Sequence, residues 1–359
     1  MTIRQWDEFY EESDYLNRYP DIAAAVATGA LRSGLDHYIV FGAREGRVGK
    51  TLSLYDEQTY LRRNPDVAAA VARGAFFSGA QHFFAFGRRE SRTFSPHFDE
   101  AFYRKRYPDV DQAIRFGAFA SGFDHFRLFG RGPLERRSAT FLNEFDYLRR
   151  YPDVAAAVDA PTGFFSASQH YDIAGQFVGI GAPFSGTRGN DEITGGQGGD
   201  TLTGVERGYG PEAIGGTLTG ALAGSYDSVG ANEQDILTGG PGADSFVVGY
   251  ADGRSRFPRQ VPFYAAAGEA DYAVIADFNL AQDTLVVAGQ SGAPSSGLPG
   301  VDFEPDGNAV RVVARLTEDG GATERRDLVA LVLGVQSPQA LQGRTAFFGS
   351  TLPIPPSTP

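Results

Sequence analysis

Four copies of one unit of about 44 residues occupy the first half of this 359-residue chain. The dipeptide Pro-Asp recurs at spacings of 45, 43 and 44 residues, at Pro20-Asp21, Pro65-Asp66, Pro108-Asp109 and Pro152-Asp153. Histidines recur at spacings of 45, 43 and 45 residues, at His37, His82, His125 and His170. One such unit is too small to bury its own apolar faces, so the four copies are expected to stack.

Each copy has the pattern of three short helices, and the second copy shows the signals well. Asp56 is the expected N-cap of a helix through Arg63, and Pro65 suits the first turn of a second helix that stops at Gly74. A capping box is expected to open each third helix, at Ser33 and Asp36, Ser78 and Gln81, Ser121 and Asp124, and Ser166 and Gln169. These signals predict an all-α repeat domain over residues 1–183, with repeats at about 8–50, 51–95, 96–138 and 139–183.

The recurring histidines and arginines raise the question of a binding site in the repeats. A residue copied in every repeat usually serves the repeat, so we interpret the four histidines as buried packing residues. His97 is out of register and is expected to face solvent. Four arginine pairs are typical of a solvated face, with acidic polysaccharide or lipopolysaccharide phosphate as an alternative partner: Arg62-Arg63, Arg88-Arg89, Arg136-Arg137 and Arg149-Arg150.

The unit reads Tyr-Leu-x-x-x-Pro-Asp-Val-Ala, then Ser/Pro-x-x-x-His-Tyr-x-x-x-Gly-x-x-Glu-Gly-Arg. In this form it resembles a helical repeat of bacterial surface and polysaccharide-related proteins. The resemblance covers about residues 8–180; Glu45-Gly46-Arg47 fits it fully, Glu90-Ser91-Arg92 nearly so, and the fourth copy lacks this ending. It implies a location at the cell surface and says little about chemistry.

The composition changes at Gly186 to Gly, Asp and Thr, which predicts a second domain over residues 184–359. Gly195–Thr203 and Gly239–Val247 match the nonapeptide Gly-Gly-x-Gly-x-Asp-x-(apolar)-x throughout, while Gly186–Thr194 misses one glycine and Gly230–Thr238 has Glu233 in place of another. Glycines permit positive φ angles, so a six-residue turn can direct its carbonyls inward. Carbonyl and carboxylate oxygens are the ligands that the hard Ca²⁺ ion prefers.

An apolar residue stands two places after each of these aspartates and predicts a short strand with one side chain in a narrow core. Successive turns fall on opposite edges, so ions are expected between rows two apart. This pairs the Asp191 turn with the Asp235 turn, and the Asp200 turn with the Asp244 turn. Residues 204–229 are then an insertion, or contain a decayed row at 216–220.

The nonapeptides resemble the calcium-binding β-roll of bacterial RTX (repeats-in-toxin, hemolysin-type) proteins. The resemblance implies a parallel β-roll that folds on millimolar external calcium after export through a type I secretion channel. It extends to residues 271–285, where an Asp completes the last ion's shell in the family. The candidate calcium ligands are Arg188, Gly189, Asn190, Asp191, Gly196, Gln197, Gly198, Asp200, Asn232, Asp235, Gly240, Pro241, Gly242, Asp244, Asp271 and Asp277.

A C-terminal β extension follows the roll. Residues 309–314 and 327–333 have the pattern of strands that flank a turn at 318–321, and residues 345–348 form another expected strand. The tail after residue 353 is not a typical export-signal ending, although in the family the uncleaved signal lies in such a C-terminal region.

Composition and charge exclude several classes. Residues 1–180 hold 22 Lys and Arg against 23 Asp and Glu, and residues 181–359 hold 10 against 21, so no basic face points to nucleic acid. There is no cysteine, no run of about 18 apolar residues for a membrane span, and no apolar leader, so export without a cleaved signal peptide is expected. Residues 97–100, His-Phe-Asp-Glu, lack the second histidine of a metalloprotease motif, and other catalytic motifs are absent, so an enzyme is not expected.

Two main hypotheses remain. In the first, the chain is a secreted, bacterial, calcium-binding structural or adhesive protein at the cell surface, such as an S-layer or filament subunit that self-assembles. In the second, the repeats bind a saccharide and the roll serves for export and folding. An accessory protein of a secreted enzyme is a third, weaker hypothesis.

Overall fold

The computed structural model describes residues 8–132, 137–160, 163–207, 228–252, 259–292, 294, 298–318 and 323–348. The chain forms two compact units, of which the first consists of Met1–Thr140 and Asp153–Gln169. The second consists of Phe141–Pro152 and His170–Pro359. Helices precede sheets of parallel and mixed strands, in the predicted order of α and β structure. The predicted domain boundary at residue 183 stays a prediction.

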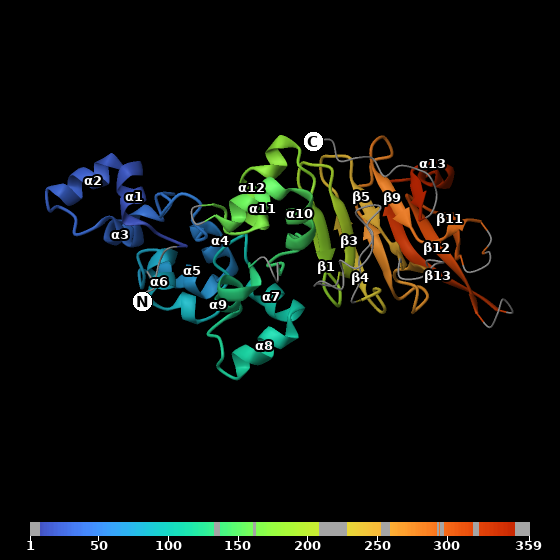
Figure 1. Cartoon of the computed structure of the whole chain (residues 1–359), viewed down its shortest axis with the longest axis horizontal. Helices are drawn as coiled ribbons and strands as arrows, with labels where there is room; N and C mark the ends of the chain where they lie inside the picture. Colours follow the sequence, from blue (N-terminus) through green and yellow to red (C-terminus); the bar gives the residue numbers. More distant parts are fainter. Residues whose placement is uncertain are drawn as a thin grey trace. The chain divides into compact units, whose positions relative to one another are not determined.

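Each of the four sequence repeats contains three short α-helices, followed by a π or 3-10 turn (Figure 1). The elements are α1 (Glu12–Arg18), α2 (Pro20–Ala27), α3 (Gly34–His37) and η1 (Tyr38–Gly42); α4 (Glu57–Arg63), α5 (Pro65–Ala72), α6 (Gly79–Ala85) and η2 (Gly87–Arg89); α7 (Glu100–Arg106), α8 (Pro108–Arg115), α9 (Gly122–His125) and η3 (Phe126–Gly130); and α10 (Glu144–Arg150), α11 (Pro152–Asp159), α12 (Ala167–Ile173) and η4 (Gly175–Val178).

The third helix of a repeat is fixed through its N-terminus. In the second repeat, Ser78 Oγ accepts a hydrogen bond from Gln81 N at 3.0 Å. The carboxylate of Glu57, at the start of α4, accepts from Gly79 N and Ala80 N at 2.7 and 2.8 Å. The first N–H groups of a helix have no partner within it, so these acceptors satisfy them and join the two helices. The first and third repeats use Glu12 with Ser33 and Glu100 with Ser121 in the same way.

A tyrosine hydroxyl and the recurring histidine share a hydrogen bond in every repeat. The distances from Oη to Nδ1 are 2.8–3.0 Å, for Tyr15 and His37, Tyr60 and His82, Tyr103 and His125, and Tyr147 and His170. Burial lowers the pKa of His37 and His82, which favours the neutral ring. These contacts support the packing role that the sequence predicts.

The expectation that His97 faces solvent is wrong. His97 is 8% exposed, and its backbone N–H donates to Ser95 Oγ at 3.1 Å. The link between repeats carries Phe94 and Phe98, which are buried and contact other rings of the first unit at centroid distances of about 5 Å. The linking segment is therefore part of the aromatic core, and this draws His97 inward.

The Pro-Asp aspartates bind arginines at the ends of their own repeats. Arg47 binds Asp21 through both terminal nitrogens, at 3.0 and 2.8 Å, and Arg92 binds Asp66 at 2.9 Å through each. Arg137 binds Asp109 in the same manner. Of the predicted arginine pairs, Arg136 lies outside the described residues. The polysaccharide alternative for these pairs remains a prediction.

The second unit is built mainly of strands. They are β1 (Pro183–Gly186), β2 (Glu192–Thr194), β3 (Thr201–Glu206), β4 (Gln234–Thr238), β5 (Ser245–Val247), β6 (Gly249–Asp252), β7 (Arg259–Pro262), β8 (Tyr272–Ile275), β9 (Thr284–Val287), β10 (Gln290–Ser291), β11 (Gly300–Asp306), β12 (Ala309–Glu318), β13 (Thr323–Leu333) and β14 (Thr345–Phe347), with the short helix α13 (Pro338–Gln342). The predicted strands at 309–314, 327–333 and 345–348 coincide with β12, β13 and β14, and the turn at 319–321 lies outside the described residues.

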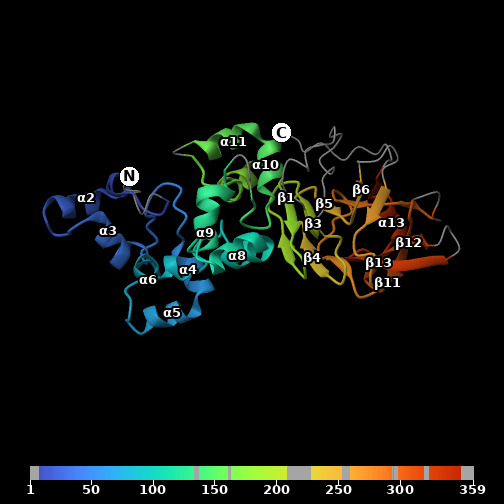
Figure 2. The same ribbon diagram turned by 60° about the horizontal axis from the view of Figure 1, so that its bottom comes forward.

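These strands form two main sheets, whose neighbouring strands lie side by side in Figures 1 and 2. One sheet has the order β1-β3-β5-β9-β14 and is parallel throughout. The other has the order β10-β11-β12-β13-β8-β4-β2, with parallel pairs from β13 to β2 and antiparallel pairs among β11, β12 and β13. From β1 to β5 the chain alternates between the two sheets.

In each strand that follows a nonapeptide turn, the residue two places after the aspartate is completely buried. Ile193, Leu202, Leu237 and Phe246, the residues two places after the aspartates, have no exposed surface. This burial agrees with the sequence pattern, because neighbouring residues of a strand point to opposite faces. Within the described ranges, no helix is long and apolar enough to cross a membrane.

Replacing His82 by Ala should lower the free energy of unfolding of the first unit by about 1–3 kcal/mol, because the buried Tyr60 hydroxyl loses its partner. Tyr60→Phe should cost less, and the double variant should cost little more than His82→Ala alone, since the two residues share one interaction. Thermal and urea unfolding of the three variants measures this. Loss of a bound transition metal from His82→Ala would contradict the packing role.

Candidate metal centre

Six aspartates end turns of the second unit. They form two sets, called edge 1 and edge 2, and the strands that follow the turns of one set belong to the same sheet. Edge 1 carries Asp191, Asp235 and Asp271; edge 2 carries Asp200, Asp244 and Asp283. The backbone N–H of Asp191 donates to Asp235 Oδ1 at 2.8 Å, and that of Asp200 donates to Asp244 Oδ1 at 2.8 Å. The pairing of turns two rows apart is thus present in the structure.

Most of these carboxylates also fold back onto their own turn. The N–H four residues earlier donates to the carboxylate in Asp191, Asp200, Asp271 and Asp283, at 2.6–3.1 Å. Glycine at the start of the turn leaves room for this return: a Cβ on Gly195 would lie 2.6 Å from Asp200 Oδ2. The nonapeptide spacing therefore produces a turn that is closed by its own final side chain.

Asp244 departs from this pattern. Its Oδ2 has no hydrogen-bond partner, although the residue is only 1% exposed. The N–H of Gly240, which occupies the position of the usual donor, instead donates to Asp277 Oδ2 at 2.8 Å. Of the six turn-ending aspartates, all within the described residues, Asp244 alone has a carboxylate oxygen without a donor. A buried carboxylate oxygen of this kind is costly unless a cation satisfies it.

The surroundings of Asp244 fit a hard cation. Burial, and after it the nearby carboxylates of Asp200, Asp283 and Asp277, raise the pKa of Asp244 to about 7. The carbonyl oxygens of Gly196 and Gly198 face the Gly239–Asp244 turn so closely that a Cβ on Gly240 would lie 2.6 Å from Gly196 O. Carboxylate and carbonyl oxygens form the donor set that Ca²⁺ prefers.

Side chains alone do not complete such a site. In the part of the chain that the structure describes, no group of three or more His, Cys, Asp or Glu side chains is arranged to hold a metal ion. A cation at edge 2 would therefore depend on backbone carbonyls, as the glycine-rich turns predict.

The structure separates the predicted ligands by edge. Edge 1 receives Arg188, Gly189, Asn190, Asp191, Asn232, Asp235 and Asp271; edge 2 receives Gly196, Gln197, Gly198, Asp200, Gly240, Pro241, Gly242, Asp244 and Asp277. Thus Asp271 and Asp277, which the sequence could not assign to particular ions, lie on different edges.

The sequence reasoning missed three residues that contact these aspartates. Asp283 accepts from Asp244 N at 3.0 Å, and its Asp-Thr-Leu sequence repeats that of Asp200, which was an available signal. Tyr171 donates to Asp200, at 2.9 and 3.0 Å from the two oxygens, and Tyr264 donates to Asp235 at 2.6 Å. Neither tyrosine lies in a nonapeptide, so no local pattern indicates its role.

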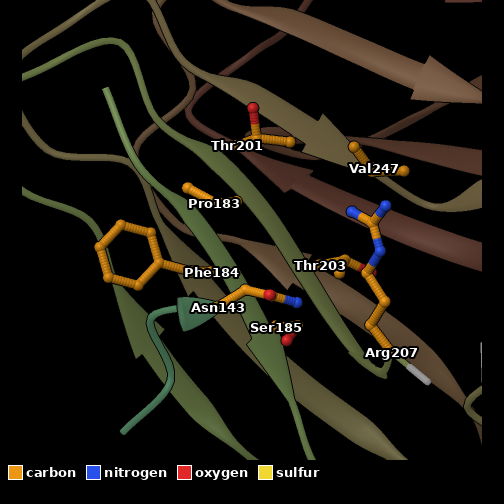
Figure 3. A pocket seen from close by; sticks show the side chains of 8 residues that line it. All are labelled: Asn143, Pro183, Phe184, Ser185, Thr201, Thr203, Arg207 and Val247. Carbon is orange, nitrogen blue, oxygen red and sulfur yellow. The ribbon is translucent and has the colours of Figure 1, made fainter. Parts of the chain in front are cut away.

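A small pocket of about 10 Å³ lies beside β1 and β3, with room for about one water molecule (Figure 3). Among the side chains around it are Asn143, Thr203 and Arg207. The Thr203 hydroxyl is buried without a hydrogen-bond partner, and Arg207 is paired with Asp146 at 2.6 Å. Asn143 N donates to Pro183 O at 2.8 Å and so covers the edge of β1. This pocket contains no carboxylate and is separate from the candidate metal centre.

Comparisons with known proteins give little guidance. No protein-family model matches the sequence, and no curated protein matches it. One solved structure that matches is the AlgE6R3 subunit of mannuronan C5-epimerase from Azotobacter vinelandii, with 19% sequence identity over 49% of this chain and 83% of that chain. Its TM-score of 0.17 is too low for this likeness to carry an argument about fold or function.

The raised pKa values predict how stability depends on pH in the absence of calcium. Burial raises the pKa of Asp235 and Asp244 to about 7 and that of Asp200 to about 6, from 3.8. The folded state then binds protons that the unfolded state releases, so this contribution is full below pH 3.8 and is lost as the pH rises through about 7. In chelator, the melting temperature of the second unit should therefore fall between pH 5 and pH 8.

Differential scanning calorimetry at several pH values measures this fall. Asp244→Asn should flatten the dependence, while Asp306→Asn, an exposed position in β11, should leave it unchanged. A melting temperature that rises over this range in chelator would show that these carboxylates are already ionised in the folded unit.

Proposed function

We propose that the second unit is a parallel β-roll of the RTX type and that it binds calcium at edge 2. The observation that carries the proposal is the buried, donor-free Oδ2 of Asp244. Two features support it: from β1 to β5 the chain alternates between two sheets whose pairs among these strands are parallel, and the inward side chains have no exposed surface. This combination of a narrow core with an unsatisfied carboxylate at a turn suits a coil that an ion completes.

The residues that would hold the ion are Asp244 with the carbonyls of Gly196 and Gly198, while Asp277 and Asp283 lie near enough to contribute charge. Calcium would supply positive charge among these carboxylates. Asp277 already accepts from Gly239 N and Gly240 N at 2.8 Å each, so it holds the turn in the form that leaves Asp244 Oδ2 open. Asp200 fixes the other oxygen of Asp244 through its own N–H.

Calcium also accounts for the charge of the second half, where 21 acidic residues face 10 basic ones. Such an excess opposes compaction unless cations reduce the repulsion. Extracellular calcium sites work at millimolar concentration, which is far above the concentration inside cells. We therefore propose that the protein acts outside the bacterial cell or on its surface.

For the first unit we propose a structural or adhesive role. Its recurring polar side chains bind one another: histidine with tyrosine, glutamate with a helix N-terminus, and arginine with aspartate. By contrast, Phe41, Phe86 and Phe129 stand four residues after the recurring histidines and are about half exposed. A repeated exposed aromatic favours contact with another surface. The saccharide-binding alternative remains a second outcome of the same tests.

Calcium should stabilise the second unit selectively. Addition of millimolar Ca²⁺ to chelated protein should raise the melting temperature of the β-structure by several degrees, while the helical transition barely moves, because the ligands lie on edge 2. Asp244→Asn should abolish most of this increase, and Asp306→Asn should retain it. Circular dichroism at helix- and strand-sensitive wavelengths separates the two transitions. An equal shift in Asp244→Asn and the parent would rule out this site.

The surface role predicts calcium-dependent assembly. Electron microscopy of purified protein should show ordered assemblies with calcium and dispersed particles in chelator. Replacing Phe41, Phe86 and Phe129 by Ser should prevent assembly without loss of calcium binding, because these side chains are exposed. Particles that stay single and bind an acidic polysaccharide would instead favour the saccharide-binding module.

A further inference from the structure

We propose that edge 1 is closed by protein groups and takes no calcium ion, so that calcium acts on one edge of the second unit alone. This inference rests on the calcium binding proposed for edge 2 and adds that calcium does not bind at edge 1. The sequence predicts an ion on each edge. On edge 1, the side chains that the structure places there favour hydrogen bonds between protein groups in place of an ion.

Tyr264 gives Asp235 the donor that Asp244 lacks. Its hydroxyl donates to Asp235 Oδ2 at 2.6 Å, the oxygen that corresponds to the donor-free Oδ2 of Asp244. Tyr264 has no exposed surface, and Gly204 and Gly230 leave room for it, since a Cβ on either would overlap the tyrosine. Its φ angle is +55°, a left-handed conformation that a bulky residue adopts only where the surroundings hold it.

Glu233 joins the two turns of edge 1 directly. It replaces a glycine of the nonapeptide, and its Oε1 accepts from Gly189 N at 2.9 Å in the turn of the neighbouring row. On edge 2 the corresponding residue is Gly242, where the Gly198 carbonyl leaves no room for a side chain. The next position adds a second link, because Asn190 Oδ1 accepts from Gln234 N at 2.9 Å. Side chains therefore connect the turns that an ion connects on the other edge.

Arg188 places a positive charge in the first turn of edge 1. Its Nε lies 3.1 Å from Glu206 Oε2, which keeps the guanidinium at the end of β3. The corresponding residues of the other three turns, Gln197, Asn232 and Pro241, are uncharged. Edge 1 thus has a donor for Asp235 and side-chain links between its turns.

Calcium counts on the full chain test the proposal. Isothermal titration with CaCl₂ after removal of bound metal should show that Asp244→Asn loses one ion relative to the parent and that Asp235→Asn loses none. Asn at position 235 keeps the acceptor for Asp191 N and offers its amide to the Tyr264 hydroxyl, so the variant is expected to fold. Loss of one ion in Asp235→Asn as well would overturn the inference.

Terbium provides a second readout that does not depend on folding of Asp235→Asn. Tb³⁺ binds oxygen ligands as Ca²⁺ does, and tyrosine sensitises its luminescence over a short range. Tyr171 contacts edge 2 through Asp200, and Tyr264 contacts edge 1 through Asp235. Sensitised emission should fall by more than half in Tyr171→Phe and stay within about a tenth of the parent in Tyr264→Phe.

The outcomes separate this inference from the proposed function. Emission lost in Tyr264→Phe would place an ion on edge 1 and overturn the inference while leaving calcium binding intact. A parent chain that binds neither Ca²⁺ nor Tb³⁺ would overturn the proposed function itself, and the inference with it. Tyr272→Phe, on β8 beside Asp271, is the matched control and should leave emission and calcium counts unchanged.

Discussion

The second unit depends on the burial of carboxylates in tight turns. Asp200, Asp235 and Asp244 are almost fully buried at the starts of strands, where an ionised group is stable only with donors or a cation beside it. Backbone N–H groups meet most of this need, because most turns return a donor to their own aspartate and the neighbouring row supplies another. The same kind of hydrogen bond therefore joins the stacked rows and stabilises the negative charge of the turns.

The helical repeats solve the same problem without a cation. They place histidines, glutamates and serines at the recurring contacts, and most of these find a partner within the repeat, as in the Tyr60–His82 and Glu57–Gly79 pairs. Because the partners come from the same copy of the unit, repetition of the sequence repeats the solution. The recurring histidines and glutamates of the first unit thus contact other groups of the fold, while Phe41, Phe86 and Phe129 are about half exposed.

The two edges of the second unit differ in the groups that contact their carboxylates, which come from the nonapeptide turns or from distant positions in the sequence. On edge 2 the consensus glycines add no side chains to the turns. The N–H of Gly240 donates to Asp277 in place of Asp244. On edge 1 the departures from the consensus, Glu233 and Arg188, coincide with a tyrosine that reaches in from residue 264. A turn that lacks a consensus glycine then satisfies its carboxylates through other protein groups.

The sequence by itself determined the repeat length, the three helices of each copy, the apolar core positions and the pairing of turns two rows apart. These follow from periodicity, because a cap, a proline or a glycine acts on the few residues around it. Only the tertiary structure decided the inward position of His97, the role of Asp283, and the placing of Asp271 and Asp277 on different edges. The hydroxyls of Tyr171 and Tyr264 and the donor-free oxygen of Asp244 also belong to this second class. These features arise from contacts between residues some 30 to 40 positions apart, and periodicity carries no information about which distant donor reaches which carboxylate.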